Sequence, residues 1–428
     1  MVRIALIVST FPVLSETFIV RQWLGLLDRG WDAHIACSRL DLEVWQQMED
    51  LSSRPELLAR THCIGPTTSK LRAALHLPKV LFSCMKHPRS TGRHWRLSIP
   101  RGWSHALRRL YLDAPLLEIN PQLIHFEFGS LAPARMDLGK ILNAHLVVSF
   151  RGFDLAFVGL GDDSYYDPVW QLADGLHLLG NDLRRRALDR GCDPGTHHAL
   201  IAPAVDSSRF KPEARPDRPE GPLRIISVGR LVWKKGYHYA IRAVRLLVDA
   251  GIPCCYTLVG TGPEIEAVAY ACHQLGLDEV VHLRGSLPRP QVLEALANAD
   301  VFLHPAVSEG FCNAVLEAQA MALPVVTTDA DGLSENVCDG ETGFVEPRRN
   351  PEALARRLAQ LAKDSDLRHR MGQAGRRRVQ VSFHPELEID RFENLYRSTL
   401  AKPRRAEALA AEALAAEALT NEQTGTRS

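Results

Sequence analysis

Short apolar runs alternate with amphipathic stretches along most of this chain. Runs without a polar break, such as 4–8 and 301–303, are typical of strands covered on both faces, as in a parallel sheet. The strands we expect are 4–8, 34–36, 123–126, 146–150, 176–179, 199–202, 223–228, 256–259, 282–284, 301–303, 324–326 and 340–345. The helices we expect are 16–27, 181–189, 239–250, 290–298, 351–363, 365–381 and 387–400, and one that begins near residue 313. The alternation predicts an α/β fold.

One segment rich in proline and charge divides this pattern. Residues 211–221, K-P-E-A-R-P-D-R-P-E-G, have no apolar periodicity and predict a linker. We therefore expect one domain at 1–210, a second at 222–385 and a separate helix at 386–401. The tail at 402–428 contains a five-residue repeat that favours helix but keeps no single helical face, so we interpret it as a low-complexity appendage.

Composition narrows the class of protein. With 428 residues, 46% of them apolar, the chain can form two large cores, and its net charge of +1 gives no general argument for nucleic acid. The nine cysteines are odd in number and none has C-x-x-C spacing, so we expect neither a disulfide framework nor a zinc site. No apolar run is long enough for a transmembrane helix or a signal peptide, which predicts a cytoplasmic protein.

The local charge distribution is less even. Residues 54–112 contain twelve Lys or Arg and a single acid, Glu56, interleaved with Leu, Val, Ile, Phe and Trp. A basic amphipathic insertion of this kind suits an anionic membrane surface. The alternative is the solvated basic face of an ordinary helical insertion. Nucleic acid could use the same charges, but the segment has no recognition motif, so we expect no nucleic-acid partner.

A stretch at 308–337 places polar residues in a strand, loop, helix and strand unit. Glu309 and Gly310 follow the expected strand 301–303, and Glu317 lies on the helix that begins near Asn313. In an open parallel sheet, ligands bind at the carboxyl ends of the strands. The free N–H groups of a helix N-terminus at that place suit a phosphate or sugar hydroxyls.

Basic residues follow the expected strand 223–228. The loop G-R-L-V-W-K-K-G at 229–236 contains Arg230 and Lys235, which would suit a diphosphate. It is not a P-loop, because G-x-x-x-x-G-K-[ST] is absent, and G-T-G at 260–262 lacks the third glycine of a dinucleotide fingerprint. Taken alone, such cations are more often simply exposed.

In order and spacing, the loop with Arg230 and Lys235, G-T-G-P-E, G-S-L-P and E-G-F-C-N-A-V-L-E resemble the retaining family 4 glycosyltransferases of the GT-B fold. This resemblance covers residues 224–393. The N-terminal half resembles members that act in bacterial exopolysaccharide or lipopolysaccharide assembly, through F-P-V-L-S-E-T-F-I, I-H-F-E-F-G and S-F-R-G-F-D. The resemblance implies two Rossmann-like domains facing across a cleft, an N-terminal one for the acceptor and a C-terminal one for the nucleotide sugar, with 386–401 as a crossover helix.

The resemblance also implies roles for single residues. Arg230 and Lys235 would hold the donor diphosphate, Glu309 would hold hydroxyls of the transferred sugar, and Glu317 would bind the ribose. Fixed cations and helix N–H groups would stabilise the departing diphosphate, so we expect no metal and no cofactor. The residues expected to contact the donor are Arg230, Lys235, Ser286, Leu287, Gly310, Phe311, Cys312, Asn313 and Glu317.

The N-terminal half departs from the family pattern. Arg151 stands where many members have a His before Gly, and Glu127 stands where many have a second His. We expect Arg151 to be the second catalytic candidate beside Glu309. Ser15, Glu16, Glu127 and Asp154 are expected on the acceptor side. Ser15 would also cap the helix at 16–27, and Gly152 would permit a tight turn.

The function implied is retaining transfer of a sugar from a nucleotide-diphosphate sugar to a glycan or lipid-linked acceptor in cell-surface polysaccharide synthesis. The enzyme would work at the inner face of the cytoplasmic membrane as a peripheral protein. A GT-B-fold sugar-nucleotide epimerase is the alternative, and it would convert the donor without any acceptor. A non-catalytic nucleotide-sugar-binding protein is a third possibility, and it would bind the donor without turnover.

Overall fold

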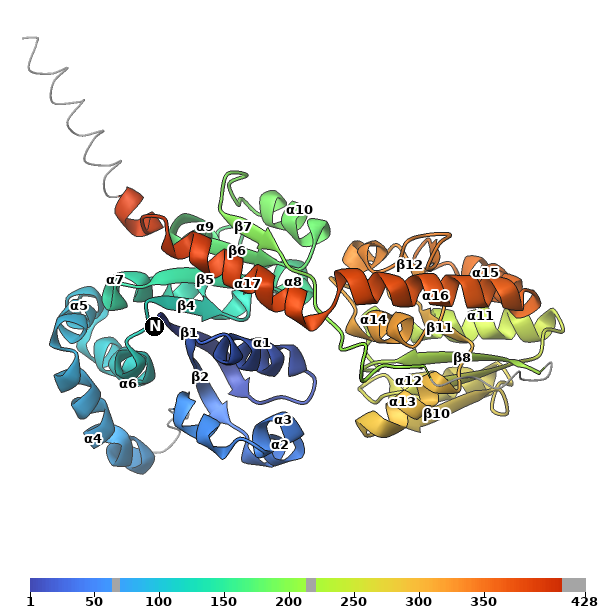
Figure 1. Cartoon of the computed structure of the whole chain (residues 1–428), viewed down its shortest axis with the longest axis horizontal. Helices are drawn as coiled ribbons and strands as arrows, with labels where there is room; N and C mark the ends of the chain where they lie inside the picture. The colour runs from blue at the N-terminus through green and yellow to red at the C-terminus, as the bar shows by residue number, and fades with distance from the viewer. Residues whose placement is uncertain (64–69, 213–220, 410–428) are drawn as a thin grey trace, which may run out of the picture. The chain divides into compact units, whose positions relative to one another are not determined.

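Two parallel β-sheets, each with helices packed on it, make up this protein (Figure 1). The computed structural model describes residues 1–63, 70–212 and 221–409, without the side chains of 70–76 and 79. Most of the predicted linker and tail therefore lies outside the described residues. The first unit comprises Met1–Leu178, Arg184–Ile201 and the chain from Ile389 onward; the second comprises Leu179–Leu183 and Ala202–Glu388. The main division thus falls at Ile201, before the predicted boundary at 210.

In the part of the chain described, the sheet of the first unit has seven parallel strands in the order β3-β2-β1-β4-β5-β6-β7. Its strands are β1 (Arg3–Phe11), β2 (Asp32–Leu40), β3 (Thr61–Cys63), β4 (Leu123–Phe126), β5 (His145–Phe150), β6 (Gly175–Leu178) and β7 (His198–Leu200). The helices that precede β7 are α1 (Thr17–Asp28), α2 (Leu42–Gln47), α3 (Glu49–Ser52), α4 (Lys70–Lys86), α5 (Pro88–Ser98), α6 (Trp103–Ile119), α7 (Leu138–Leu142), α8 (Gly152–Phe157), α9 (Asp167–Leu172) and α10 (Asn181–Asp189). Two short 3-10 turns, η3 (Gly129–Leu131) and η4 (Pro133–Arg135), follow β4.

Helix α17 (Pro385–Leu400), which follows the second unit in the chain, completes the core of the first unit. Phe392, Leu395 and Tyr396 pack in one cluster with Ile4 and Leu6 of β1 and with the buried residues of α1. The Tyr396 hydroxyl lies 2.8 Å from Nε2 of Gln22 and 2.6 Å from Nδ1 of His125. The side chain of Ile7 points to the opposite face of the sheet, where α6 packs against β1.

In the second unit, the described residues form a six-stranded parallel sheet in the order β10-β9-β8-β11-β12-β13. Its strands are β8 (Leu223–Val228), β9 (Cys254–Val259), β10 (Val281–Gly285), β11 (Val301–His304), β12 (Val325–Thr328) and β13 (Gly343–Glu346). Its helices are α11 (Tyr237–Asp249), α12 (Ile265–Gln274), α13 (Arg289–Ala297), α14 (Asn313–Ala320), α15 (Pro351–Lys363) and α16 (Ser365–Ser382), with a 3-10 turn η5 (Trp233–Lys235) after β8.

Successive side chains of β8 point to opposite faces of the sheet, and the core of the second unit therefore has two layers. Ile225 packs in a cluster with residues of α11, α12 and α15, whereas Ile226 packs in a second cluster with residues of α13, α14 and α16. Neighbouring strand residues point to opposite faces, so helices cover the sheet on both sides. β8 lies between β9 and β11, so the chain order reverses there, and parallel sheets bind ligands at that kind of position.

The predicted α/β fold is confirmed, and β4, β8, α10 and α15 have the predicted bounds. The sequence pattern missed β3, the short helices α2, α3, α7, α8 and α9, and the longer helix α12. In α12 most residues are apolar, although only Val268 and Cys272 are buried, so the sequence shows no single apolar stripe there. Two local predictions are wrong. The N-cap residue of α1 is Glu16 and no side chain caps it, so Ser15 is not the cap, and Gly152 is the first residue of α8 rather than a tight turn.

Among the described residues, none of the helices combines the length and the apolar character that crossing a bilayer would require. The basic insertion at 54–112 includes α4, α5 and the first part of α6, and α4 and α5 pack against α6.

Candidate active site

The loops that follow β8 and β11 meet at the point where the strand order reverses. The backbone N–H of Val307 donates to the Lys234 carbonyl at 2.8 Å. Gly236 has a φ of +65°, and a Cβ atom on it would lie 2.2 Å from the Pro305 carbonyl oxygen. Only glycine accommodates both that backbone conformation and that approach. The glycine that ends G-R-L-V-W-K-K-G therefore lets the two loops touch.

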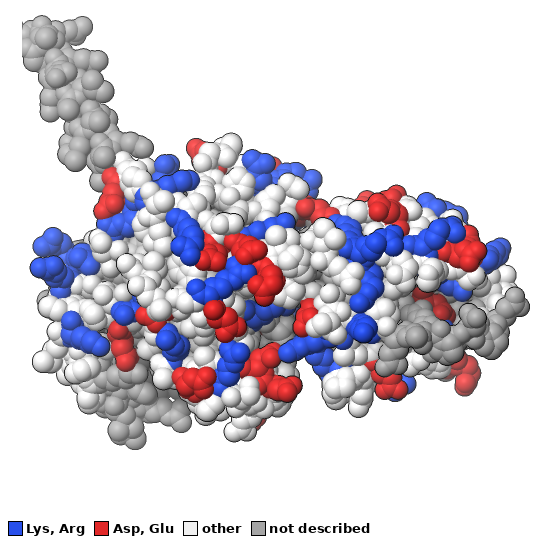
Figure 2. Space-filling view, in the orientation of Figure 1, with Lys and Arg blue, Asp and Glu red and all other residues white. Residues whose placement is uncertain are grey.

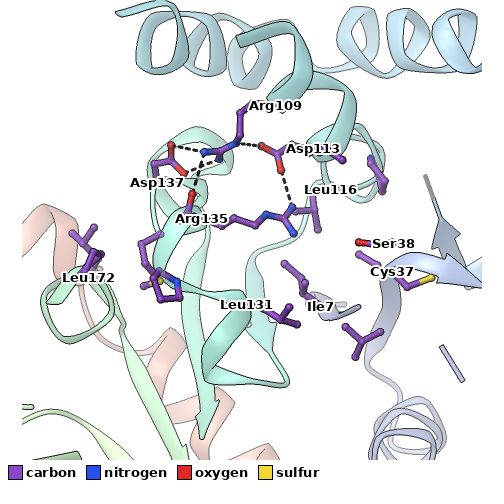
Figure 3. Close-up of a pocket in the computed structure, with 18 of the residues that line it drawn as sticks. Ile7, Cys37, Ser38, Arg109, Asp113, Leu116, Leu131, Arg135, Asp137 and Leu172 are labelled. Atoms are coloured by element: carbon purple, nitrogen blue, oxygen red, sulfur yellow. Dashed lines mark hydrogen bonds and ion pairs between the residues drawn. The ribbon is translucent and has the colours of Figure 1, made fainter. Parts of the chain in front are cut away.

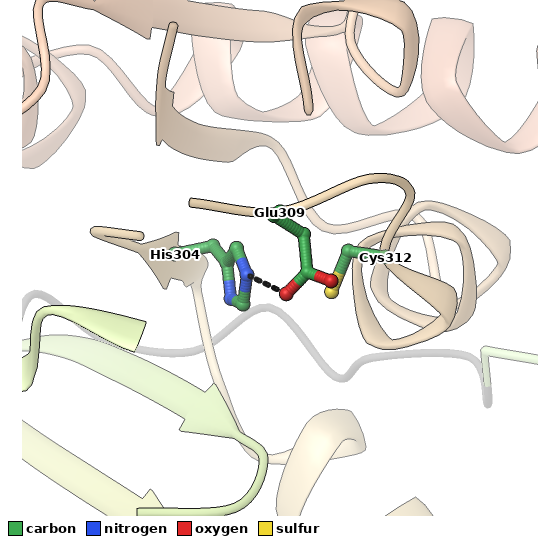
Figure 4. A group of neighbouring side chains, drawn as sticks. All are labelled: His304, Glu309 and Cys312. Carbon is green, nitrogen blue, oxygen red and sulfur yellow. Dashed lines mark ion pairs between the residues drawn. The ribbon is translucent and has the colours of Figure 1, made fainter. Parts of the chain in front are cut away.

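A buried ion pair joins these two loops. Lys235 Nζ donates to Glu309 Oε2, and the two side chains are 13% and 11% exposed. Cys312 Sγ lies 3.9 Å from the same Nζ, and Nε2 of His304, which is fully buried, lies 3.8 Å from Glu309 Oε2. Figure 4 shows the carboxylate of Glu309 between the His304 ring and the Cys312 sulfur. The predicted residues Lys235, Glu309 and Cys312 thus lie together.

The pair is charged at neutral pH. Burial disfavours ionisation of Glu309, but Lys235 and His304 outweigh it and hold the pKa of that carboxyl well below its ordinary value. Burial likewise opposes the charge on Lys235, and Cys312 and Glu309 outweigh that effect and raise the pKa of the ammonium. Lys234 is different: burial lowers its pKa and outweighs the opposite effect of Glu309, and Lys235 and Arg230 add to the decrease.

His304, Glu309 and Cys312 are residue types that can hold a metal ion, and their ligand atoms lie within 4.8 Å of one another. The Lys235 ammonium bonds to Glu309 and lies against Cys312, so a fixed positive charge already neutralises this cluster. A metal cation at the same place would be repelled by that charge. We therefore interpret the cluster as a support for the ion pair.

A second set of polar residues holds the Glu309 loop in place. Asp331 Oδ2 accepts from Ser308 Oγ at 2.6 Å and from the Glu309 N–H at 3.2 Å. Asn336 both accepts from the Cys312 N–H and donates to the Cys312 carbonyl, each at 3.1 Å. The sequence reasoning missed His304, Asp331 and Asn336 as supporting residues. The sequence could have indicated them, because His304 ends β11 and because Asp331 and Asn336 follow β12, at the same edge of the sheet as Glu309.

The remaining donor-side residues lie on neighbouring elements of the same edge. Cys312 is the N-cap of α14, no side chain caps that helix, and Glu317 is half-buried in its second turn. A Cβ atom on Gly260 would lie 1.9 Å from the Gly229 carbonyl, and the Gly260 N–H donates to the Gly285 carbonyl at 2.7 Å. Gly260 therefore connects Gly285, which precedes Ser286 and Leu287, to the loop after β8 that contains the exposed residue Arg230. Phe311 packs near Phe383 with 5.9 Å between ring centres, and Gly310 and Asn313 are half-buried.

In the first unit, Arg151 is held rather than free. Its guanidinium donates to Glu127 Oε2 at 3.2 Å and lies 4.2 Å from the Phe18 ring centre. Glu127 is fully buried and also accepts from Gln22, at 3.1 Å. Asp154 is 1% exposed, and it accepts from the backbone N–H groups of Arg151 and Ser130.

Glu127 and Asp154 therefore bind protein groups in the interior. We interpret them as residues that position Arg151 and α8, rather than as direct acceptor contacts. Ser15 is exposed and Glu16 is half-buried, in the loop that leads into α1.

Comparison with known proteins agrees with this arrangement. The family model described as glycosyl transferases group 1 matches residues 209–378. WcaL of Escherichia coli strain K12, named for colanic acid biosynthesis, is 28% identical over 90% of this chain and 97% of its own length. The amylovoran biosynthesis glycosyltransferase AmsK of Erwinia amylovora is 30% identical over 82% of this chain and 89% of its own. The structure of Anabaena HepE in complex with UDP-glucose superposes with a TM-score of 0.70, at 14% identity, over 93% of this chain and all of that one.

Two α/β units, each built on a parallel sheet, define the GT-B class of glycosyltransferase, as the resemblance implied. Within that class, the chain belongs to the group 1 glycosyl transferases.

Gly236 offers a test of the contact between the two loops. Gly236→Ala should cost more stability than Gly251→Ala, because both have positive φ but a Cβ at Gly251 meets nothing within 4 Å. The backbone strain alone is about 1 kcal/mol. Thermal unfolding of both variants checks this. Equal losses would contradict the close approach of Gly236 to Pro305.

Lys235→Met should destabilise the protein by about 3 kcal/mol at neutral pH, because it leaves the Glu309 carboxylate buried without its partner. Glu309 has a depressed pKa, so its ion pair contributes stability above pH 4.5, the ordinary value for its carboxyl, and that contribution falls as the pH falls below it. The difference between wild type and variant should therefore shrink in acid. Urea unfolding at several pH values measures it.

Lys234→Met is the matched control for this variant and should cost less than about 1 kcal/mol, as for weakly paired charges. Adding Glu309→Gln to Lys235→Met should recover much of the stability, because the orphaned charge is then gone. The ion pair would lose its assigned role if the Lys234 and Lys235 variants unfolded alike.

Proposed function

We propose that this glycosyltransferase moves a sugar from a nucleotide-diphosphate sugar to a glycan or lipid-linked acceptor in cell-surface polysaccharide synthesis. We further propose that it retains the anomeric configuration and needs neither a metal ion nor a cofactor. The observation that carries the proposal is the buried Lys235–Glu309 pair beside the uncapped N-terminus of α14. The names of WcaL and AmsK, which refer to exopolysaccharides, support the polysaccharide part.

The surroundings of Lys235 fit a departing diphosphate. Breaking a sugar–phosphate bond builds negative charge on the leaving group, and preorganised donors stabilise that charge best where water is excluded. Lys235 supplies a fixed ammonium, Arg230 lies in the same loop, and α14 begins with free N–H groups next to Cys312. These groups together supply the charge that a metal ion supplies in other enzymes, which supports the metal-independent proposal.

The surroundings of Glu309 fit a residue that positions the sugar. A carboxylate whose pKa is held far below neutral binds protons weakly, so it is a poor general acid or base. Its bond to Lys235 also reduces its strength as a nucleophile. It remains a good hydrogen-bond acceptor, and sugar hydroxyls are suitable donors. We therefore propose that Glu309 orients the transferred sugar, with attack from the face that the leaving group occupies.

Arg151 remains our second catalytic candidate, for an anionic group of the acceptor or the donor. Glu127 and the Phe18 ring hold its guanidinium in one orientation, which reduces the entropy lost when it binds. Ser15 and Glu16 lie in a loop after β1, and β1 pairs with β4, the strand that Glu127 follows. We keep them as acceptor-side residues.

We also propose that the enzyme docks peripherally on an anionic membrane, at the inner face of the cytoplasmic membrane. Large apolar side chains are exposed on α4 and α6, namely Leu77, Leu81, Phe82, Met85, Trp103 and Leu107. The neighbouring helix α5 carries Arg89, Arg93 and Arg96. In the view of Figure 2, Lys and Arg atoms gather at the far left, where Figure 1 places α5. Exposed apolar residues beside cations suit an interface of lipid and anionic headgroups.

Replacing Glu317 by Gln should weaken donor binding about tenfold or more, because a charged acceptor of the ribose hydroxyls becomes neutral. A thermal-shift screen with UDP- and GDP-sugars identifies the donor first, since a bound ligand raises the unfolding midpoint. Titration of wild type and variant with that donor then measures the loss. Glu352→Gln, at an exposed position of α15 in the same unit, is the matched control and should bind normally. Equal affinities of the two variants would contradict the assigned role of Glu317.

Product analysis separates transfer from the alternative activity. Incubation with the donor alone should give no isomerised sugar nucleotide, and added acceptor should give a glycosylated product with retained configuration. An isomer formed without acceptor would overturn the transferase proposal in favour of an epimerase.

Phe82→Glu combined with Met85→Glu should abolish cosedimentation with vesicles that contain phosphatidylglycerol. Both side chains are more than half exposed, so folding should be unaffected. Tyr270→Glu, an equally exposed aromatic site on α12, is the control and should bind like wild type. Binding should also weaken with salt and be poor on phosphatidylcholine. Full binding by the double variant would contradict the docking proposal.

A further inference from the structure

A large cavity lies inside the first unit, and Arg151 is not among the residues that line it. Its volume is about 700 Å³, within the range of small-molecule sites. β1 and β2 form one wall, α6 forms a second, and η3, η4 and α9 close it (Figure 3). All the residues that line it belong to the first unit.

Most of the lining is apolar. Ile7 comes from β1, Leu116 from α6, Leu131 from η3, Met136 from the segment after η4, and Leu172 from α9. Ile7, Leu116 and Met136 are buried in the protein, and Leu131 and Leu172 are half-buried. A cavity with such walls favours a hydrocarbon chain over a sugar, because sugar hydroxyls would lose their hydrogen bonds to water.

One side of the cavity carries a network of charges. Arg109 is fully engaged: it donates to Asp113 at 3.2 Å, to Asp137 at 2.8 Å and to the Ala134 carbonyl at 3.2 Å. Arg135 donates through Nη2 to the other oxygen of Asp113, at 2.7 Å. Figure 3 shows Arg135 extending along the cavity from η4 toward Asp113. The two aspartates thus fix the guanidinium groups in place.

The charged side chains that line the cavity carry a net positive charge. Arg101, Arg109 and Arg135 line the cavity together with only two acids, Asp113 and Asp137. Arg101 is exposed, and its contact with Asp137 is weak, because the nearest nitrogen and oxygen atoms are 3.5 Å apart. His105 also lines the cavity, but its Nε2 is buried out of reach of a water molecule, so the arginines are the charged donors on this side. Cationic donors therefore remain available for an anion.

We propose that this cavity binds a lipid phosphate, meaning a phosphate or diphosphate ester of a long apolar chain. The chain segment next to the phosphate lies between Ile7, Leu116, Leu131 and Leu172, and the phosphate binds Arg101 and Arg135. The proposal deepens the proposed function and rests on it, because it makes the acceptor a lipid-linked one and gives its lipid a place.

The full-length protein is tested with dodecyl phosphate and farnesyl phosphate below their micellar concentrations, by isothermal titration calorimetry. Both should bind, and inorganic phosphate and dodecanol should bind at least tenfold more weakly, because each offers only half of the interaction. Tighter binding of farnesyl phosphate would mark an isoprenoid lipid, and tighter binding of dodecyl phosphate an acyl-type lipid. Equal binding of dodecanol and dodecyl phosphate would overturn the proposal, as would no binding of either ester.

Variants locate the binding to this cavity. Leu131→Glu and Leu172→Glu place a charge in two different walls at half-buried positions, and each should weaken binding tenfold or more. Arg135→Gln should do the same through the phosphate. Arg108→Gln, an exposed neighbour on α6 that does not line the cavity, is the matched control and should bind normally. If the Arg108 and Arg135 variants bound alike, or if both leucine variants bound like wild type, the cavity would not be the site.

The Glu317→Gln variant separates this inference from the proposed function. It should bind dodecyl phosphate normally while it loses donor affinity. Normal donor binding and transfer by a wild-type protein that binds neither ester would overturn the lipid site and leave the proposed function standing. Ester binding without any sugar transfer would overturn the proposed function instead.

Discussion

The buried contact between the Lys235 ammonium and the Glu309 carboxylate organises the second unit. Each charge would be costly alone in a buried place, and each is tolerated because the other is there. The glycine at 236, the Asp331 carboxylate and the Asn336 amide all serve to bring the two loops to that contact. The residue that we propose to bind the donor diphosphate is therefore also one on which folding depends, so we expect substitution of Lys235 to change stability along with activity.

Much of the fold follows from the sequence because parallel strands covered on both faces are continuous apolar runs. Strands such as β4 and β8 and helices such as α10 and α15 were predicted with correct bounds. The site was predicted in part: motif order brought Lys235, Glu309 and Cys312 to one loop pair. His304, Asp331 and Asn336 were missed, because a buried polar residue that supports another shows no pattern along the chain. Glu127 and Asp154 were expected to face an acceptor, and only the three-dimensional packing reveals that protein groups already occupy their oxygens.

The two units use charge in different ways. In the second unit a single Lys–Glu pair is held where a diphosphate would bind. In the first unit, Asp113 and Asp137 hold three arginines along one wall of an apolar cavity. Carboxylates in both places keep cations in fixed orientations, and a fixed cation loses less entropy when it binds an anion. The same physical device thus suits a nucleotide sugar on one side and an amphiphilic phosphate on the other.

The position of α17 has a consequence for how the protein is made. Its last turns supply Phe392, Leu395 and Tyr396 to the core of the first unit, although nearly all of the second unit precedes them in the chain. On the ribosome, the first unit emerges early but lacks part of its core until α17 has been made, whereas most domains fold as they emerge. The hydroxyl of Tyr396 then reaches Gln22 and His125, residues made hundreds of codons earlier. The first unit can therefore complete its core only after the whole of the second unit has been synthesised.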